Sequence, residues 1–335
     1  MKSFEDQSSR SYLMSPQPSP FWSVMIPVYN STRYLAKTLE SVLRQDPGPG
    51  EMQIEVVDGH STIDEPSELV RRVAGDRVAV FTHPSPLPMF ANWNSCIERA
   101  RGEWVHILHS DDIVLPGFYA QLHRNLACRP ELGAAFVRWS VVDENGNLVS
   151  TAAPERSEAG VLENAVERLS SGQRVQFVSV VVRKSAYLAL GGFRSDLIYA
   201  LDWEMWSRLA AHFPVWYDPA VLASFRVHQH SESSRLRRAR EDGRDAGKCI
   251  SIIAKRLPAK SAARDELADR SIEVARDLFI DRQLRAGFRQ IRLTFGIRCS
   301  PAVIRSVVSM LAWSVAQACR ASLRKLGVIS PRVRA

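Results

Sequence analysis

Two adjacent carboxylates follow a short apolar run in the segment HILHSDDIVLPGFY, residues 106–119. Asp111 and Asp112 could hold a divalent cation, because hard cations take oxygen ligands and share them with substrate phosphates. The pair could also act in acid–base catalysis. In a third interpretation Asp112 caps the helix that Pro116 introduces, since aspartate is a common capping residue. The local sequence leaves the three alternatives open.

The chain around this segment predicts an α/β fold with a mostly parallel sheet. Apolar runs typical of buried strands occupy residues 22–30, 52–58, 77–82 and 103–109. Helical patterns separate them over about 31–43, 66–74 and 89–101. Alternation of this kind indicates βαβ units. Asn30, Asp58 and Asp111 then follow the carboxyl ends of strands, which is where open α/β sheets bind ligands.

The second half of the chain predicts a few strands and then helices. Asn145-Gly146 is a hairpin signal, and residues 175–183 have the composition of a strand. LDWEMWSRLAAH, residues 201–212, predicts a helix that a last strand follows. In segment 280–295 four arginines share one side of a helix and four apolar residues the other. They are Arg282, Arg285, Arg289 and Arg292, and Leu284, Phe288, Ile291 and Phe295.

The composition is that of an ordinary globular protein, with 45% hydrophobic and 24% charged residues in 335. Five scattered cysteines without a CxxC pair argue against a zinc site or a disulfide framework. They favour a reducing, cytoplasmic compartment. The N-terminus has no signal-peptide pattern, and no apolar run reaches the roughly 18 residues of a membrane span.

The formal net charge of +8 is concentrated near the C-terminus, because residues 231–335 carry 23 Lys+Arg and only 10 Asp+Glu. We therefore expect three parts: a flexible leader at 1–20, a domain at 21–234 and a basic helical region at 235–335. The basic excess lies outside any recognised nucleic-acid-binding module, so we expect no nucleic-acid partner.

Several stretches, taken in order, resemble family 2 glycosyltransferases. The nucleotide-sugar half of that family is similar to FWSVMIPVYNSTRYLAKTLESVLRQ, IEVVDGHST and NWNSCIERARGEWVHILHSDD. The resemblance continues through GGF and ALDWEMWSRLA to FRVHQHSES, and so covers about residues 22–234. It implies the GT-A fold and a nucleoside-diphosphate sugar donor, with Mg²⁺ or Mn²⁺ to neutralise the leaving diphosphate. It also implies inverting transfer to a saccharide or lipid-linked saccharide hydroxyl, in cell-surface polysaccharide biosynthesis.

The resemblance implies roles for individual positions. Asp111 matches the last aspartate of the family's Asp-x-Asp motif, which contacts the metal, and His228 would contact metal or phosphate. Asp202 matches the carboxylate that removes the acceptor proton, with Glu204 as the second candidate. Arg226 offers a fork of donors for phosphate oxygens. The residues implied to bind the nucleotide-sugar are Pro27, Val28, Tyr29, Asn30, Asp58, His109, Asp112 and Arg226.

His109 departs from the family pattern, because the first aspartate of Asp-x-Asp stands at this position. A histidine can bond a hydroxyl, act as a softer metal ligand, or weaken metal dependence. Purely structural alternatives also stay open: Asp202 could cap its helix, and Asp58 could form an Asx-turn. So do two other functions, a nucleotidyltransferase and a non-catalytic nucleotide-sugar-binding protein. PVYNSTRYL is not the glycine-rich phosphate loop that a nucleotidyltransferase would carry.

The basic region has two interpretations. Its amphipathic helix and the segment VVSMLAWSVAQAC, residues 307–319, could lie on an anionic membrane. A lipid-linked acceptor would then place the protein peripherally on the inner face of the membrane. In the other interpretation the helices pack on the preceding domain or on a second subunit of a homo-oligomer.

Overall fold

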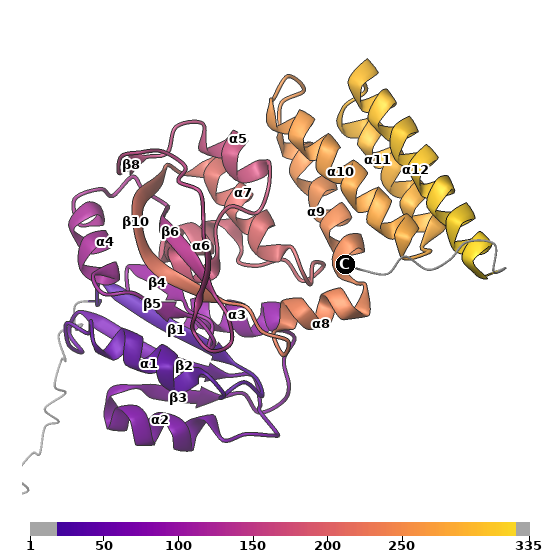
Figure 1. Ribbon diagram of the computed structural model, residues 1–335. Helices are drawn as coiled ribbons and strands as arrows, with labels where there is room; N and C mark the ends of the chain where they lie inside the picture. The colour runs from indigo at the N-terminus through magenta and orange to yellow at the C-terminus, as the bar shows by residue number, and fades with distance from the viewer. Residues whose placement is uncertain (1–18, 326–335) are drawn as a thin grey trace, which may run out of the picture.

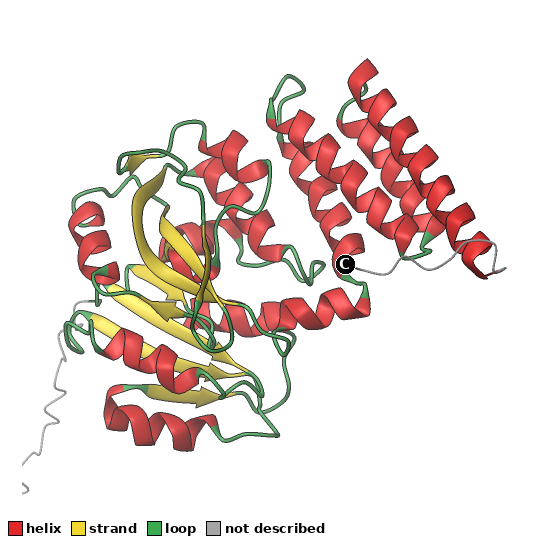
Figure 2. Cartoon of the chain, viewed as in Figure 1, coloured by secondary structure: helices red, strands yellow, loops and turns green. Residues whose placement is uncertain are grey.

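The computed structural model describes residues 19–325 as a curved sheet with helices on both faces and a group of helices toward the C-terminus (Figures 1 and 2). Most of the expected leader, residues 1–18, lies outside the described residues. The helices of the sheet-containing part are α1 Leu35–Leu43, α2 Pro66–Ala74, α3 Met89–Arg99, α4 Phe118–Leu126, α5 Ala165–Ser170, α6 Lys184–Leu190 and α7 Leu201–His212. Those that follow are α8 Glu232–Ala239, α9 Asp242–Arg256, α10 Ala263–Ile280, α11 Leu284–Ile297 and α12 Pro301–Lys325.

The strands form one sheet in the order β3-β2-β1-β4-β9-β6-β10-β5. Neighbours from β3 to β4 are parallel, as are β6 and β10, whereas β9 runs antiparallel between β4 and β6. The strands are β1 Trp22–Val28, β2 Met52–Asp58, β3 Ala79–Thr82, β4 Trp104–Ile107, β5 Ile113–Val114, β6 Ala134–Val142, β7 Leu148–Thr151, β8 Gly160–Val161, β9 Val180–Arg183 and β10 Val215–Arg226. The α/β prediction is confirmed.

β1 is buried on both sides because its side chains alternate between two hydrophobic clusters. Val24, Ile26 and Val28 pack in one cluster with side chains of α1, α2 and α4. Met25 points to the other face, into a cluster with α3 and α7. A strand that is covered on both faces has a continuous run of apolar residues, so β1 could be predicted from the sequence.

Two local predictions differ from the structure. The segment 175–183 is a strand only from Val180, because a 3₁₀ helix, Phe177–Ser179, precedes it. The first helix, expected from about residue 31, begins at Leu35 with no side-chain cap. The hairpin at Asn145-Gly146 is confirmed, since β6 pairs antiparallel with β7.

The apolar face predicted for segment 280–295 is also wrong in part. Leu284 and Phe288 are 56% and 59% exposed, whereas Ile291 is buried. The α11 side that meets α10 carries small and polar residues instead. Gly287 lies so close to α10 that an added Cβ would stand 2.9 Å from the Phe279 ring, and Thr294 hydrogen-bonds the hydroxyl of Ser271 at 2.7 Å. The close approach of α10 and α11 therefore determines which side of α11 is buried.

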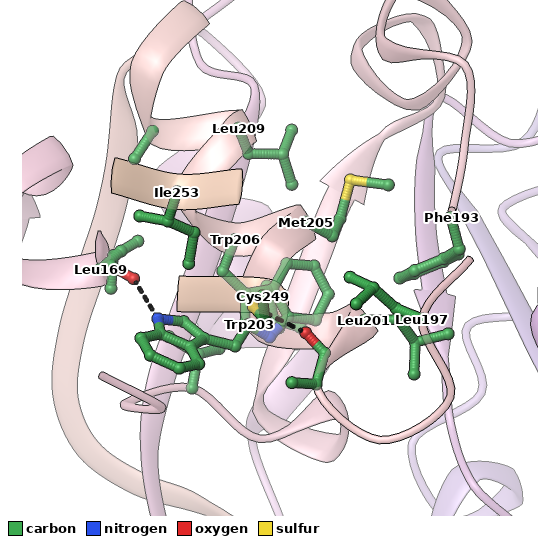
Figure 3. Close-up of a cluster of buried hydrophobic side chains, with 14 of the residues drawn as sticks. Leu169, Phe193, Leu197, Leu201, Trp203, Met205, Trp206, Leu209, Cys249 and Ile253 are labelled. Carbon is green, nitrogen blue, oxygen red and sulfur yellow. Dashed lines mark hydrogen bonds between the residues drawn. The ribbon is translucent and has the colours of Figure 1, made fainter. Parts of the chain in front are cut away.

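Helix α9 joins the C-terminal helices to the start of α7. The cluster around α7 includes Cys249 and Ile253 of α9 (Figure 3). The buried carboxylate of Asp245 accepts backbone N–H groups of Ile198 at 3.0 Å, Tyr199 at 2.7 Å and Ala200 at 2.8 Å. One side chain from the basic region thus satisfies three donors in the loop that leads into α7.

We predict that Asp245→Asn lowers the free energy of unfolding by about 2 kcal/mol, because an amide nitrogen would replace an acceptor and leave buried donors unpaired. Chemical denaturation measures the change. Asp242→Asn removes the same charge from the same helix, but no side-chain bond of Asp242 is formed within residues 19–325. It should cost less than about 1 kcal/mol. Equal losses in the two variants would contradict the role given to Asp245.

Candidate active site

The loops that follow β1 and β2 hold each other through polar side chains. Asp58 accepts from the backbone N–H and the hydroxyl of Ser61 at 2.9 and 2.7 Å, and the Ser61 hydroxyl accepts from the Asn30 N–H at 2.8 Å. The Asn30 side chain accepts from the N–H groups of Thr62 and Ile63 at 2.8 and 3.0 Å. Asn30 has a left-handed backbone, with φ of 49°. Both predicted donor-site residues therefore also shape the loops.

The predicted residues of the first strand end differ in exposure. Pro27 and Val28 are buried within β1, whereas Tyr29 is 50% exposed immediately after it. Asn92 of α3 donates to the Val57 carbonyl at 3.1 Å and so braces the end of the neighbouring β2. A flat exposed ring beside a fixed backbone edge can pack against a planar ligand.

The turn 109–112 connects β4 to β5 at the same edge of the sheet. The Thr38 hydroxyl lies 2.9 Å from the Ser110 carbonyl and 2.8 Å from the Asp112 carbonyl, so α1 fixes the turn. β5 pairs antiparallel with β10, which brings the residues after β10 beside the turn. Segments more than 100 residues apart in sequence therefore meet at the two aspartates.

The end of β10 bonds directly to these aspartates. The Arg226 N–H donates to Asp112 Oδ1 at 2.8 Å, and His228 Nε2 lies 2.9 Å from Asp111 Oδ2. The Arg226 guanidinium is buried, donates to the carbonyls of Asp111 and Asp143 at 2.9 and 3.0 Å, and stands 4.7 Å from the ring centre of Tyr34. In this arrangement Arg226 fixes the turn, and its contact with phosphate stays a prediction.

His109, Asp111 and Asp112 fit a divalent cation. One ligand atom from each lies within 4.8 Å of the others. His109 Nε2 and Asp112 Oδ2 are buried and lack a hydrogen-bond partner in the described part of the chain. Burial lowers the pKa of His109, which leaves a neutral ring able to ligate a metal. Burial, followed by the charge of Asp111, raises the pKa of Asp112. A bound cation would satisfy polar atoms that are costly to leave unpaired.

Aromatic rings connect His109 to α7. His109 stacks on Trp93 of α3 with ring centres 5.1 Å apart and lies 4.5 Å from the ring of Phe177. Phe177 in turn lies 5.3 Å from Trp206. Trp93 therefore packs within this aromatic cluster. The cluster forms an apolar wall between the turn 109–112 and the helix that begins near Asp202.

Asp202 is half-buried in the first turn of α7. Its carboxylate accepts from the Trp203 N–H at 2.7 Å and from the Gln173 side chain. Burial raises the pKa of Asp202 to about 7, against the opposing effect of these hydrogen bonds. A carboxylate that titrates near neutrality is suited to general-base catalysis.

Glu204 has a different setting. It is fully buried and forms ion pairs with Arg208 of α7, at 2.9 Å, and with Arg256 of α9. Its carboxylate therefore ties α7 to the C-terminal helices, and Asp202 remains the candidate base. The sequence offered no signal for Gln173, Tyr34 or Asp245, since each acts through a tertiary contact that no local pattern encodes.

Comparisons with known proteins agree with this geometry. Residues 23–182 match the model of glycosyl transferase family 2. An uncharacterized protein of Mycobacterium tuberculosis is 27% identical over 72% of this chain and 79% of its own length. The chain spans only 37% and 32% of two further curated relatives, which carry the name glycosyltransferase.

Two solved structures share the fold. S. aureus TarS in complex with UDP-GlcNAc superposes with a TM-score of 0.60 at 17% identity, over 88% of this chain and 80% of that one. A mannosyltransferase of Pyrobaculum calidifontis in complex with GDP-Man and Mn²⁺ has a TM-score of 0.54 at 18% identity, over 88% and 81% of the two chains. The match of residues 23–182 to this family and the shared sheet together support a family 2 glycosyltransferase with the GT-A fold.

Proposed function

We propose that the chain transfers a sugar from a nucleoside-diphosphate sugar to a hydroxyl of a saccharide or lipid-linked saccharide, with inversion, in cell-surface polysaccharide biosynthesis. The observation that carries the proposal is the turn 109–112, which fits a cation and packs through Phe177 on Trp206 of α7. The first turn of that helix holds Asp202, a carboxylate of pKa about 7. Family membership favours this transfer over a nucleotidyltransferase or a non-catalytic binding protein.

The donor would lie across the ends of β1, β2 and β4. Tyr29 offers an exposed ring, and Asp58 lies at the end of β2, where it could accept a bond from the base or ribose. The complexes of TarS with UDP-GlcNAc and of the mannosyltransferase with GDP-Man support a nucleotide-sugar donor.

A divalent cation, Mg²⁺ or Mn²⁺, would be held by Asp111 with His109 and Asp112. When bound it supplies positive charge that stabilises the departing diphosphate. His228 contacts Asp111, so it either orients this carboxylate or joins the ligand set. The Mn²⁺ in the mannosyltransferase complex supports a metal here.

Asp202 would accept the proton of the acceptor hydroxyl. One direct displacement at the anomeric carbon, with proton removal by a single carboxylate, gives inversion. Gln173 holds one carboxylate oxygen and so orients the base. The apolar wall of Trp93, Phe177 and Trp206 would keep water from competing with the acceptor.

The general test is release of nucleoside diphosphate from a panel of donors with Mn²⁺ present. The wild-type chain should hydrolyse its matching donor slowly without acceptor and faster with acceptor. Binding of a donor without any turnover, across the panel and with polysaccharide acceptors, would contradict the proposal.

For the base, we predict that transfer by the wild type rises with pH through about 7 and then levels, because Asp202 acts when ionised and burial holds its pKa high. Asp202→Asn should reduce transfer by about 10²- to 10⁴-fold. The variant should fold as well as the wild type. Because the pKa of Asp202 is higher in the folded chain than in the unfolded chain, the wild type loses some stability as pH rises from about 4 to 7. Asn is never ionised, so the variant does not have this loss. Initial rates and denaturation curves test both statements.

Glu163→Gln, at an exposed carboxylate, is the control. Full transfer by Asp202→Asn would refute the assignment.

For the metal, we predict that Asp111→Ala abolishes the stabilisation of the chain by Mn²⁺, and that His109→Asp raises affinity for Mg²⁺ about tenfold, because Mg²⁺ prefers oxygen to imidazole nitrogen. Thermal shift with the metal alone measures both. Asp76→Asn, in an exposed turn, should change neither. An unchanged Mn²⁺ response in Asp111→Ala would exclude the turn as the metal site.

We also propose that the C-terminal helices contact an anionic membrane surface. No helix within residues 19–325 is long and apolar enough to cross a bilayer. However, α12 exposes Ile304, Val308 and Val315 along one face, by 46%, 60% and 63%. No acidic residue follows Asp281 in the sequence, so α12 itself carries basic residues and no acidic ones. An exposed apolar stripe on such a helix fits anionic lipid headgroups better than a second, equally basic copy.

Vesicle co-sedimentation tests this contact. The full chain should bind phosphatidylglycerol vesicles and not phosphatidylcholine vesicles, and Val308→Glu should weaken binding because it places a charge in the apolar stripe. Leu188→Glu, at an exposed leucine of α6, should bind like the wild type. Equal binding by Val308→Glu and the wild type would rule the stripe out.

A further inference from the structure

An open pocket of about 420 Å³ lies between the segment that follows β10 and helix α8. Val227, His228 and Gln229 line one side, and Ser234, Arg237 and Arg238 line the other. His228 is the residue that contacts Asp111, so the pocket adjoins the candidate metal site. None of the roles given above uses the arginines of α8.

The pocket also touches the acceptor side. Arg237 Nε donates to the hydroxyl of Tyr199 at 3.2 Å, and the loop of Tyr199 leads into the helix of Asp202. The pocket is therefore lined by His228, which contacts the candidate metal site, and by Arg237, which bonds the loop before α7. A ligand there would sit beside the donor's diphosphate or beside the incoming acceptor.

The charges of α8 distinguish the pocket from the rest of the helix. Arg235 is paired with Glu232 at 2.6 Å, and Arg240 with Asp281 at 3.3 Å. Arg237 and Arg238 have no carboxylate partner in the described range; besides the Tyr199 contact, Arg238 donates to the Gln229 carbonyl at 2.6 Å. Two guanidinium groups thus keep most of their donors free at the pocket, and guanidinium forks match phosphate oxygens.

We propose that Arg237 and Arg238 form a phosphate-binding subsite. The shared chemistry is a phosphate group, which belongs either to the donor's diphosphate or to a phosphate-bearing acceptor. The inference rests on the proposed function for the position of the donor, but phosphate binding can be measured without any transfer.

The experiment compares Arg237→Gln/Arg238→Gln with Arg235→Gln, which removes an arginine of the same helix that is already paired. Calorimetry on the full chain measures binding of inorganic pyrophosphate to the free protein. It also measures binding of UDP and GDP with Mn²⁺, and of inorganic phosphate to protein saturated with whichever nucleotide binds. All three side chains are exposed, so we expect both variants to fold, and melting temperature checks this.

A donor subsite predicts that the double variant loses about tenfold or more in nucleoside-diphosphate affinity. An acceptor subsite predicts unchanged nucleotide affinity and loss of the additional phosphate bound by the saturated wild type. Arg235→Gln should match the wild type in both assays. Pyrophosphate binding that depends on Arg237 and Arg238 would uphold the subsite even if no nucleotide bound, which separates this inference from the proposed function. Equal binding of all probes by the double variant and the wild type would overturn it.

Discussion

The bond from the Arg226 N–H to the buried carboxylate of Asp112 is the contact on which the rest of the site depends. A buried carboxylate requires hydrogen-bond donors, and here the donor is the backbone of β10. Satisfying Asp112 therefore fixes β10 against the turn 109–112 and sets the distance from His228 to Asp111. The Arg226 side chain strengthens the same connection through the Asp111 carbonyl and the Tyr34 ring. Arg226, for which the family resemblance implies a phosphate contact, thus also holds the turn through its backbone and its side chain.

The acceptor side depends in a similar way on the C-terminal helices. Asp245 holds the loop before α7, and the ion pair of Arg256 with Glu204 fixes the next turn of that helix. Both contacts come from α9, and the hydrophobic cluster of α7 continues into α9 (Figure 3). The basic region is therefore structurally part of the half of the molecule that carries Asp202. Truncation before α9 would remove supports of the proposed base as well as the proposed lipid contact.

The sequence predicted well those features that depend on local periodicity. Strand β1 was visible as an apolar run because both of its faces are buried, and α7 was visible from residues 201–212. The packed face of α11 was not predicted, because Gly287 and Thr294 face α10, whereas larger apolar residues were expected to pack there. Among site residues, the acids at strand ends could be grouped by topology alone. Gln173, Asp245 and the buried position of Arg226 could not, since each depends on contacts between distant segments.

The stacking of His109 on Trp93 has a consequence for the site before any ligand arrives. An aspartate at 109 would place three carboxylates within a few ångströms, and their mutual repulsion would push the turn open until a cation entered. A neutral imidazole held between aromatic rings removes one of those charges and adds a rigid neighbour. The turn 109–112 is thus expected to keep its shape without metal. A cation that binds at this edge would then find its ligands already in place, and binding would need little rearrangement of the protein.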